Sequence, residues 1–248
     1  MRFRRLQFFL SIAQLRLAKA WFSLAHPRSW RALGRGVAPS LEHRDVLREL
    51  DCDLLLDVGA DRGQFSLMAR LLHPGWRIRA YEPQPSGAAV FRAVFLGHAG
   101  IELHEVALGE VKRTAQFHVS RRADSSSLLP IGELQSNLFP GTEERGTINV
   151  EVVPLDSLEA HWMSASRALL KLDVQGYELN VLRGAQYALR HCAFVYAECS
   201  EIALYAGQAL YPEVAAFLDR EGFKAIRRAN EQWAEGRLVQ ADYLFARA

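Results

Sequence analysis

The chain has 248 residues, of which 50% are hydrophobic, 23% charged and 10% aromatic, enough apolar material for one large folded domain. This composition excludes a disordered, collagen-like or coiled-coil protein. The three cysteines, at positions 52, 192 and 199, form no CxxC pair, and their odd number leaves no complete disulfide framework. We therefore expect a reducing, cytoplasmic compartment and no structural zinc.

The charge is distributed unevenly along the chain. Residues 1–41 contain eight Lys and Arg and no acid, so the remainder has 22 basic and 28 acidic side chains, a formal net charge of −6. The part that looks folded therefore lacks the basic field that gathers nucleic acid. We expect its partner to be a small molecule or a glycan- or lipid-linked acceptor, and not a nucleic acid.

The first 24 residues have the spacing of a basic amphipathic helix. The run is too short and too polar to span a bilayer, and its broken apolar core does not fit a signal peptide. One interpretation is a helix that contacts a membrane surface or a partner; the others are a helix packed on its own domain or a second subunit, and an organelle transit peptide. The apolar positions are Phe3, Leu6, Leu10, Ala13, Leu17, Ala20 and Leu24, with Arg2, Arg4, Arg5, Arg16 and Lys19 between them.

His26-Pro27 should end this helix, because proline disfavours helical geometry in the residue before it. Residues 34–40 contain two glycines and a proline and are typical of a linker. We therefore divide the chain into an N-terminal helix and linker, residues 1–40, and one domain, residues 41–248.

The domain begins with a strand, a tight turn and a helix. Residues 54–59 form an apolar run that stops at Gly59, and the apolar residues 65, 68, 69 and 72 follow at helical spacing. Asp61 and Gln64 have the spacing of a capping box. Residues 76–81 then predict a second strand ending in Glu82, which is where a nucleoside-binding fold holds a ribose diol. The alternative for Glu82 is a solvated strand end.

The turn indicates which nucleoside is bound. It reads DVGADRG, residues 57–63, and lacks the GxGxxG pattern that lets the backbone approach a pyrophosphate. Its two carboxylates, Asp57 and Asp61, would repel a pyrophosphate but suit a ligand with an ammonium and a sulfonium group. S-adenosylmethionine (SAM) has both groups.

Four ordered motifs, DVGADRG, YEPQP, HEVALG and LLKLDVQGYELNVLRGA, make the chain resemble the FkbM family of SAM-dependent methyltransferases. This resemblance covers about residues 53–248 and implies an α/β, Rossmann-like class I fold: a seven-stranded, mostly parallel sheet with helices on both faces. It also implies Asp57, Gly59 and Gly63 at the methionine end of the cofactor and Glu82 on the ribose. The candidate cofactor-binding residues are Asp57, Gly59, Ala60, Asp61, Gly63, Phe65, Glu82, Pro83, Ala107, Leu108, Ser126 and Asp173.

The middle of the chain predicts a third strand at 101–106, followed by Ala107-Leu108, which in this fold usually borders the adenine. Residues 115–119 and 148–152 alternate apolar and polar, which predicts an antiparallel pair added to the sheet. The long segment 121–146 between them favours a lid or binding loop, with a solvated mobile excursion as the alternative. The family resemblance places Ser126 there, near the cofactor and acceptor.

Residues 168–174 predict a buried strand in which Lys171 and Asp173, two positions apart, share one face. The resemblance matches them to a KxDVxGxE motif, and both are candidate catalytic residues. Asp173 is our candidate for the residue facing the transferred methyl group, and the alternative is a Lys171–Asp173 pair that only stabilises the strand end. Glu198 follows the next strand, 193–197, and is a second candidate at the acceptor site. Glu178 should cap the following helix.

These observations favour an O-methyltransferase that uses SAM and acts on a hydroxyl of a sugar, glycolipid or polyketide-like molecule. Neither HExxH nor a carboxylate-rich ion loop occurs, so we expect no obligatory metal. The alternatives are a nicotinamide-dependent oxidoreductase and a non-catalytic module of the same fold. The missing GxGxxG argues against the first, and the intact motif residues argue against the second.

Overall fold

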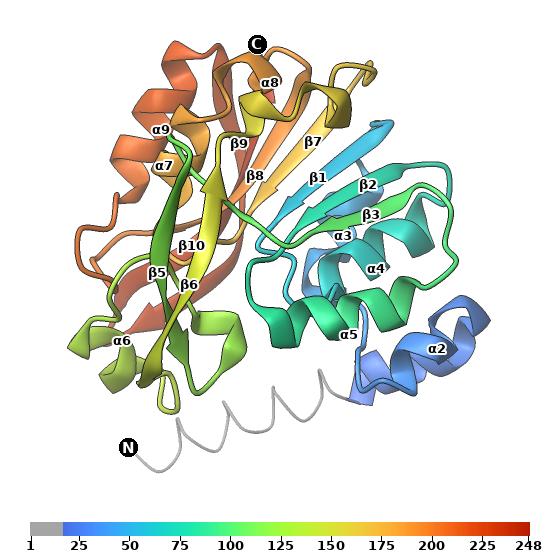
Figure 1. Cartoon of the computed structure of the whole chain (residues 1–248), viewed down its shortest axis with the longest axis horizontal. Coiled ribbons are helices and arrows are strands. Elements are labelled where there is room, and N and C mark those ends of the chain that lie inside the picture. The colour runs from blue at the N-terminus through green and yellow to red at the C-terminus, as the bar shows by residue number, and fades with distance from the viewer. Residues whose placement is uncertain (1–16) are drawn as a thin grey trace.

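The computed structural model describes residues 17–248 and contains a central seven-stranded sheet with helices on both faces (Figure 1). The strand order is β3-β2-β1-β7-β8-β10-β9; β10 runs antiparallel to both of its neighbours and the other paired strands run parallel. The predicted Rossmann-like α/β fold is confirmed. The strands are β3 (Ile101–His104), β2 (Arg77–Tyr81), β1 (Leu54–Val58), β7 (Ala168–Leu172), β8 (Cys192–Ser200), β10 (Arg237–Arg247) and β9 (Phe223–Ala234).

The two faces of the sheet follow from side-chain alternation in the central strands. All five residues of β1 and of β7 are buried. Leu55 and Leu169 meet one helical layer, whereas Leu56 and Leu170 meet the other. The first layer contains α3 (Arg44–Arg48), α4 (Gln64–Leu72) and α5 (Pro85–Phe95); the second contains α7 (Glu178–Arg183), α8 (Gln186–Leu189) and α9 (Tyr211–Arg220).

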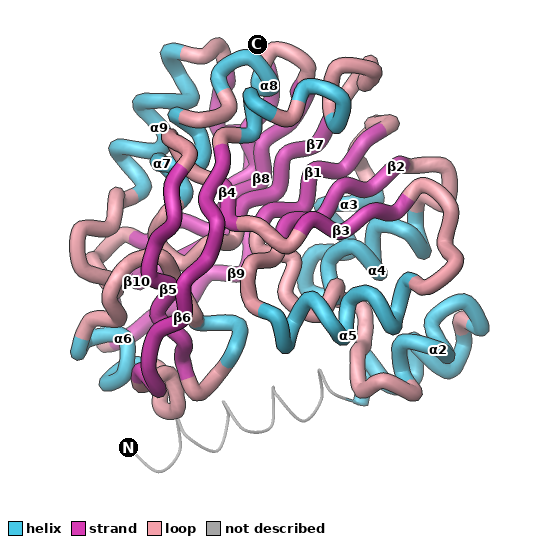
Figure 2. The backbone as a smooth tube through the Cα atoms, in the orientation of Figure 1, coloured by secondary structure: helices cyan, strands magenta, loops and turns pink. Residues whose placement is uncertain are grey.

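The predicted antiparallel pair forms, but it does not extend the seven-stranded sheet. Strands β5 (Arg113–Ser120) and β6 (Glu144–Val153) pair with each other, and the short β4 (Ala107–Leu108) adds to β6, making a separate three-stranded sheet (Figure 2). Its apolar face has its own core, which includes Phe117 and Val152. The segment expected to be one long loop contains helix α6 (Glu133–Leu138) and the first residues of β6.

The N-terminal helix is described from residue 17 to residue 25, and it ends before His26 as predicted. Its predicted positions in residues 1–16 lie outside the described residues. Beyond it, helix α2 (Trp30–Leu33) leads into residues 34–40, where Val37 is buried in a cluster with Phe91 of α5. Among residues 17–248, no helix is both long and apolar enough to cross a membrane.

The predicted capping box at the start of α4 is wrong. The helix begins at Gln64, and its N-cap is Gly63, which has the left-handed backbone conformation. Asp61 also has a positive φ, and its carboxylate accepts a bond from the Gln64 side chain. The turn continues two residues further than expected, because both positions take up left-handed geometry before the helix begins.

Candidate functional site

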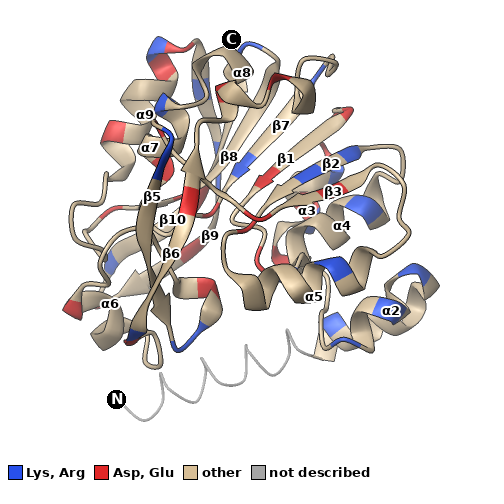
Figure 3. Ribbon diagram, in the orientation of Figure 1, with Lys and Arg blue, Asp and Glu red and all other residues tan. Residues whose placement is uncertain are grey.

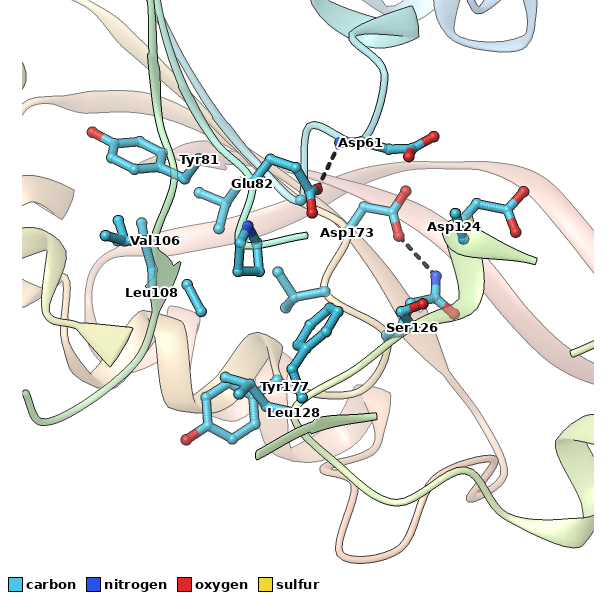
Figure 4. Close-up of a pocket in the computed structure, with 18 residues that line it drawn as sticks. Asp61, Tyr81, Glu82, Val106, Leu108, Asp124, Ser126, Leu128, Asp173 and Tyr177 are labelled. Atoms are coloured by element: carbon cyan, nitrogen blue, oxygen red, sulfur yellow. Dashed lines mark hydrogen bonds between the residues drawn. The ribbon is translucent and has the colours of Figure 1, made fainter. Parts of the chain in front are cut away.

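A cavity lies where β1, β2 and β7 end, the edge at which open α/β sheets bind ligands. It is walled by the turns after these strands, by β4 and by residues between β5 and α6 (Figure 4). Its lining residues are Val58, Gly59, Asp61, Tyr81, Glu82, Pro83, Val106, Ala107, Leu108, Phe117, Ala123, Asp124, Ser126, Leu128, Asp173, Val174, Gln175 and Tyr177.

The two glycines of the turn each allow a different close approach of neighbouring elements. Gly59 has a φ of 74°, and a Cβ atom there would lie 1.9 Å from the carbonyl oxygen of Asp173. Only glycine therefore lets the ends of β1 and β7 come this close beside the cavity. Gly63 lies away from the lining, and a Cβ there would be 2.6 Å from the Phe95 ring, so this glycine allows α5 to pack against the turn.

Glu82 is buried at the end of β2, and each of its carboxylate oxygens accepts one backbone hydrogen bond. Oε2 accepts from the Asp61 N–H at 2.8 Å, and Oε1 accepts from the Gln84 N–H at 2.7 Å. Burial raises the pKa of Glu82 to about 7, although these two bonds act in the opposite direction. A carboxylate has about four acceptor positions, so capacity for two ligand hydroxyls remains.

Lys171 and Asp57 form a buried pair behind the cavity wall. The ammonium nitrogen of Lys171 lies 3.2 Å from Oδ1 of Asp57 and donates to the carbonyl of Gly59 at 2.8 Å. Burial by itself lowers the pKa of Lys171, but Asp57 and Asp173 outweigh it and the net shift is upward. Ser66 donates to Asp57 at 2.6 Å. This pair fixes the glycine turn from behind.

Asp173 and Glu198 are joined through Gln175. The Gln175 amide nitrogen donates to Oδ1 of Asp173 and to Oε2 of Glu198, both at 2.8 Å, and its oxygen accepts from the Tyr205 hydroxyl at 2.7 Å. Glu198 also accepts from Gln240, and burial together with nearby carboxylates raises its pKa. The Asp173 side chain is 41% exposed, and Nζ of Lys171 lies 3.8 Å from its Oδ2. Asp173 is thus the accessible carboxylate of the three-residue network.

The cavity has two chemically different ends (Figure 4). Among the described residues that line it, none is Lys or Arg. A cation with an apolar portion therefore complements this lining better than an anion does. The carboxylates, all toward one end in Figure 4, belong to Asp61, Glu82, Asp124 and Asp173. The apolar and aromatic groups at the other end belong to Tyr81, Val106, Leu108, Leu128 and Tyr177.

The segment suggested as a lid is bonded to its surroundings in this structure. Ser126 accepts from the Ser120 N–H at 3.0 Å, and the buried Ser127 donates to the carbonyl of Gln175 at 2.8 Å. Residues 118 and 127 also form an isolated bridge. Ser126 lines the cavity, and the segment connects the second sheet to the turn after β7. Its role as a lid stays a prediction.

The structure brings most predicted cofactor residues to the cavity but leaves six predicted site residues outside the lining. Tyr81 and Gln175 line the cavity but were not among the predicted site residues, although each lies within a quoted motif. The sequence had no signal for Phe117, because the second sheet brings that residue in from a distant strand. The predicted residues in the lining are Gly59, Asp61, Glu82, Pro83, Ala107, Leu108, Ser126 and Asp173. Those outside it are Asp57, Ala60, Gly63, Phe65, Lys171 and Glu198.

The strand order, the antiparallel β10 and a cavity at the carboxyl ends of the parallel strands place the chain in the Rossmann-like class I methyltransferase fold. Residues 57–225 match the family model described as the methyltransferase FkbM domain. The chain belongs to the FkbM methyltransferase family.

Two relatives are similar over most of their length. The "31-O-demethyl-FK506 methyltransferase FkbM" of Streptomyces tacrolimicus is 30% identical over 207 residues, covering 73% of this chain and 76% of the relative. The "2-O-methyltransferase NoeI" of Sinorhizobium fredii (strain NBRC 101917 / NGR234) is 28% identical over 174 residues, covering 67% and 72%. Among solved structures, the precorrin-6y C5,15-methyltransferase of Geobacter metallireducens GS-15 aligns over 82% of this chain and 88% of its own, with 12% identity and a TM-score of 0.45.

Proposed function

We propose that this methyltransferase uses SAM and methylates a hydroxyl group on a sugar, glycolipid or polyketide-like small molecule. The observation that carries the proposal is the two-ended cavity, with carboxylates at one end and aromatic and aliphatic groups at the other. Both relatives are named as O-methyltransferases or for an O-demethyl substrate, which supports oxygen as the acceptor atom. Without a basic residue in its lining, the cavity is a poor site for the pyrophosphate of a nicotinamide dinucleotide.

The residues present fit SAM. Glu82 retains acceptor positions for the two ribose hydroxyls, and the aromatic and aliphatic side chains of Tyr81, Leu108 and Tyr177 offer an apolar surface for the adenine. Gly59 keeps the end of β1 clear of side-chain atoms, and the surrounding carboxylates favour the cationic groups. When bound, SAM supplies a methyl group on a positively charged sulfur, which makes that carbon open to displacement.

We propose that Asp173 is the residue that contacts the acceptor hydroxyl. Its half-exposed carboxylate lines the cavity at the end of β7, and Gln175 donates to one of its oxygens while Lys171 faces the other. An alcohol must lose its proton as it attacks, so Asp173 accepts that proton or orients the hydroxyl. Glu198 accepts a second hydrogen bond from the Gln175 amide nitrogen, which fixes the orientation of the Gln175 side chain toward Asp173.

The proposal is tested by calorimetric titration of the full chain with SAM, with its demethylated product and with NAD. Binding of the first two and not of NAD is expected; binding of NAD alone, or of none, overturns the cofactor assignment. Labelled SAM then serves to screen hydroxylated sugars, lipids and macrolides. With an identified acceptor, Asp173→Asn should lower kcat, measured at saturating SAM, by about 100-fold or more.

A further inference from the structure

The helix over residues 17–25 has two unlike faces. One face is attached to the domain: Phe22 packs against the core cluster that contains Phe65, Ser23 is buried, and Lys19 forms an ion pair with Glu42 at 2.8 Å. The opposite face presents large apolar side chains to solvent. Leu17, Trp21 and Leu24 lie at positions i, i+4 and i+7 of that face, and Trp21 is 71% exposed.

The exposed apolar surface continues beyond this helix. The indole nitrogen of Trp30 donates to the carbonyl of Leu24 at 3.1 Å, so the exposed Trp30 adjoins the stripe. Arg31 donates to the backbone carbonyl of Leu96, the residue directly after α5, and the Leu96 side chain is exposed. We call Leu17, Trp21, Leu24, Trp30 and Leu96 the N-terminal apolar surface. Exposed apolar side chains that gather on one surface are typical of an interaction site.

The charged residues within the segment 17–41 are all basic. Residues 17–41 contain Lys19, Arg28, Arg31 and Arg35 and no acidic residue, and in Figure 3 the segment carrying α2 has blue residues without red ones. The three arginines are exposed, and among the described residues none of them forms an ion pair. Segments that lie in the headgroup region of an anionic bilayer typically combine tryptophan and leucine with arginines that have no acidic partner.

We propose that the N-terminal apolar surface docks this methyltransferase on anionic membrane lipid, with Trp21 and Leu24 entering the boundary of the acyl chains and the arginines contacting headgroups. Leu17, Trp21 and Leu24 lie on the side of their helix away from the domain, where a lipid surface can reach them. Charge complementarity selects anionic lipid over neutral lipid. This proposal does not depend on the identity of the cofactor or the acceptor.

The test is sedimentation of the full chain with vesicles of phosphatidylcholine, with and without phosphatidylglycerol. We expect binding only to the anionic vesicles, and a loss of binding at high salt, because salt shortens the range of the charge interaction. The double substitution Trp21→Ser/Leu24→Ser should weaken binding by about tenfold or more. Trp233→Ser is the matched control, since Trp233 is 56% exposed on β9, and it should bind as wild type does.

A second readout uses the wild-type chain. Lipids brominated on their acyl chains should quench its tryptophan fluorescence, and Trp21→Phe/Trp30→Phe should remove that quenching while Trp233→Phe retains it; thermal unfolding by circular dichroism verifies that each variant is folded. Equal sedimentation of wild type and the Trp21→Ser/Leu24→Ser variant overturns the proposal. A second result would also overturn it: the wild-type chain binds no vesicle but forms a dimer, and Trp21→Ser dissociates that dimer. A second copy of the chain would then cover the face.

Discussion

The carboxylate of Glu82 is oriented before any ligand arrives, because two backbone N–H groups already hold its oxygens. One of these groups belongs to Asp61, in the turn after β1, so the residue that ends β2 and the turn beside it form one unit. Burial makes the charge of this unit costly, as the pKa near 7 indicates. A ligand that donates hydroxyl hydrogen bonds and carries positive charge offsets that cost.

Replacing Glu82 with alanine should weaken SAM binding by about 1 to 3 kcal/mol, because the ribose hydroxyls lose their acceptor. Calorimetric titration measures the change. Glu102→Ala provides a control, since Glu102 is an exposed carboxylate on the adjacent strand β3 and pairs with Arg79. Wild-type affinity in the Glu82→Ala protein would contradict the assignment.

Cofactor affinity should also depend on pH through Glu82. Its pKa of about 7 in the folded protein means that it is mostly protonated at about pH 6 and mostly charged at about pH 8. Because the charged form is the better acceptor and attracts a cation, SAM should bind about tenfold more tightly at the higher pH. The Glu82→Gln variant should show a much flatter profile; an equally steep one would assign the titration to another group.

A methyl group at Gly59 should destabilise the protein by about 2 kcal/mol or more, since it would meet the carbonyl of Asp173 and also force a side chain into a positive φ. Urea unfolding measures this. Gly75→Ala is the matched control, because a Cβ there meets no atom within 4 Å, and its effect should stay within about 0.5 kcal/mol. Equal stability of the two variants would show that the close approach is not required.

Sequence reasoning identified site residues where a strand end and a turn fall together. Glu82 and Asp173 could be found because each lies at the carboxyl end of a predicted strand, and parallel strands bring such positions to one edge of a sheet. Asp57 and Lys171 were predicted as site residues from their charge within motifs, yet they lie inside β1 and β7 and pair with each other behind the wall. Two charged groups in adjacent buried strands satisfy one another, and the linear sequence does not show this.

At the scale of elements, the turn between β7 and α7 is built around two side chains. Gln175 takes a positive φ of 54° and bridges Asp173 and Glu198. Glu178, expected to cap the helix that it begins, accepts instead from the N–H groups of Val174 and Gly176 in the preceding turn. The turn is therefore fixed from both ends, which holds the Asp173 carboxylate toward the cavity.

Burial raises the pKa of Glu178 to about 7, and this has a consequence for stability. A carboxyl whose pKa is raised on folding contributes its full stabilisation below its ordinary value near 4.5, and loses it as pH rises through about 7. Glu178→Gln keeps an acceptor oxygen and removes the charge. Relative to wild type, the variant should gain up to about 3 kcal/mol of unfolding free energy between about pH 5 and pH 8.

Urea unfolding at both pH values measures that gain, and Glu235→Gln in the exposed turn between β9 and β10 is its control. The control variant should keep a constant difference from wild type across the range. A Glu178→Gln variant that behaves in the same way would mean that Glu178 does not titrate with folding.

The second sheet shows that the alternation of a strand does not determine which sheet the strand joins. Alternation in residues 115–119 and 148–152 predicted the antiparallel pair correctly, since period-two alternation needs only one buried face. It did not indicate which sheet would receive the pair. That choice depends on β4, a two-residue strand too short to have a periodicity of its own.

At the scale of the molecule, the sequence predicted the limits of the central strands better than those of the strands at one edge. The apolar cores of β1, β2 and β7 are bounded by glycine, proline or charge, and their limits were close to those observed. Strands β9 and β10 reach 12 and 11 residues, and charged or polar residues interrupt the apolar ones in both. Most of β9 is exposed at the edge of the sheet, so its polar residues carry no apolar signal.

The position of β10 has a consequence for how the chain acquires its structure. This strand is later in the sequence than both of its neighbours, yet it lies between them and buries Val239 and Phe245. Until residues 237–247 leave the ribosome, β8 and β9 have no hydrogen-bonding partner on the sides that will face each other. Two strand edges then remain open to pairing with the wrong segment until one late segment fills the place between them.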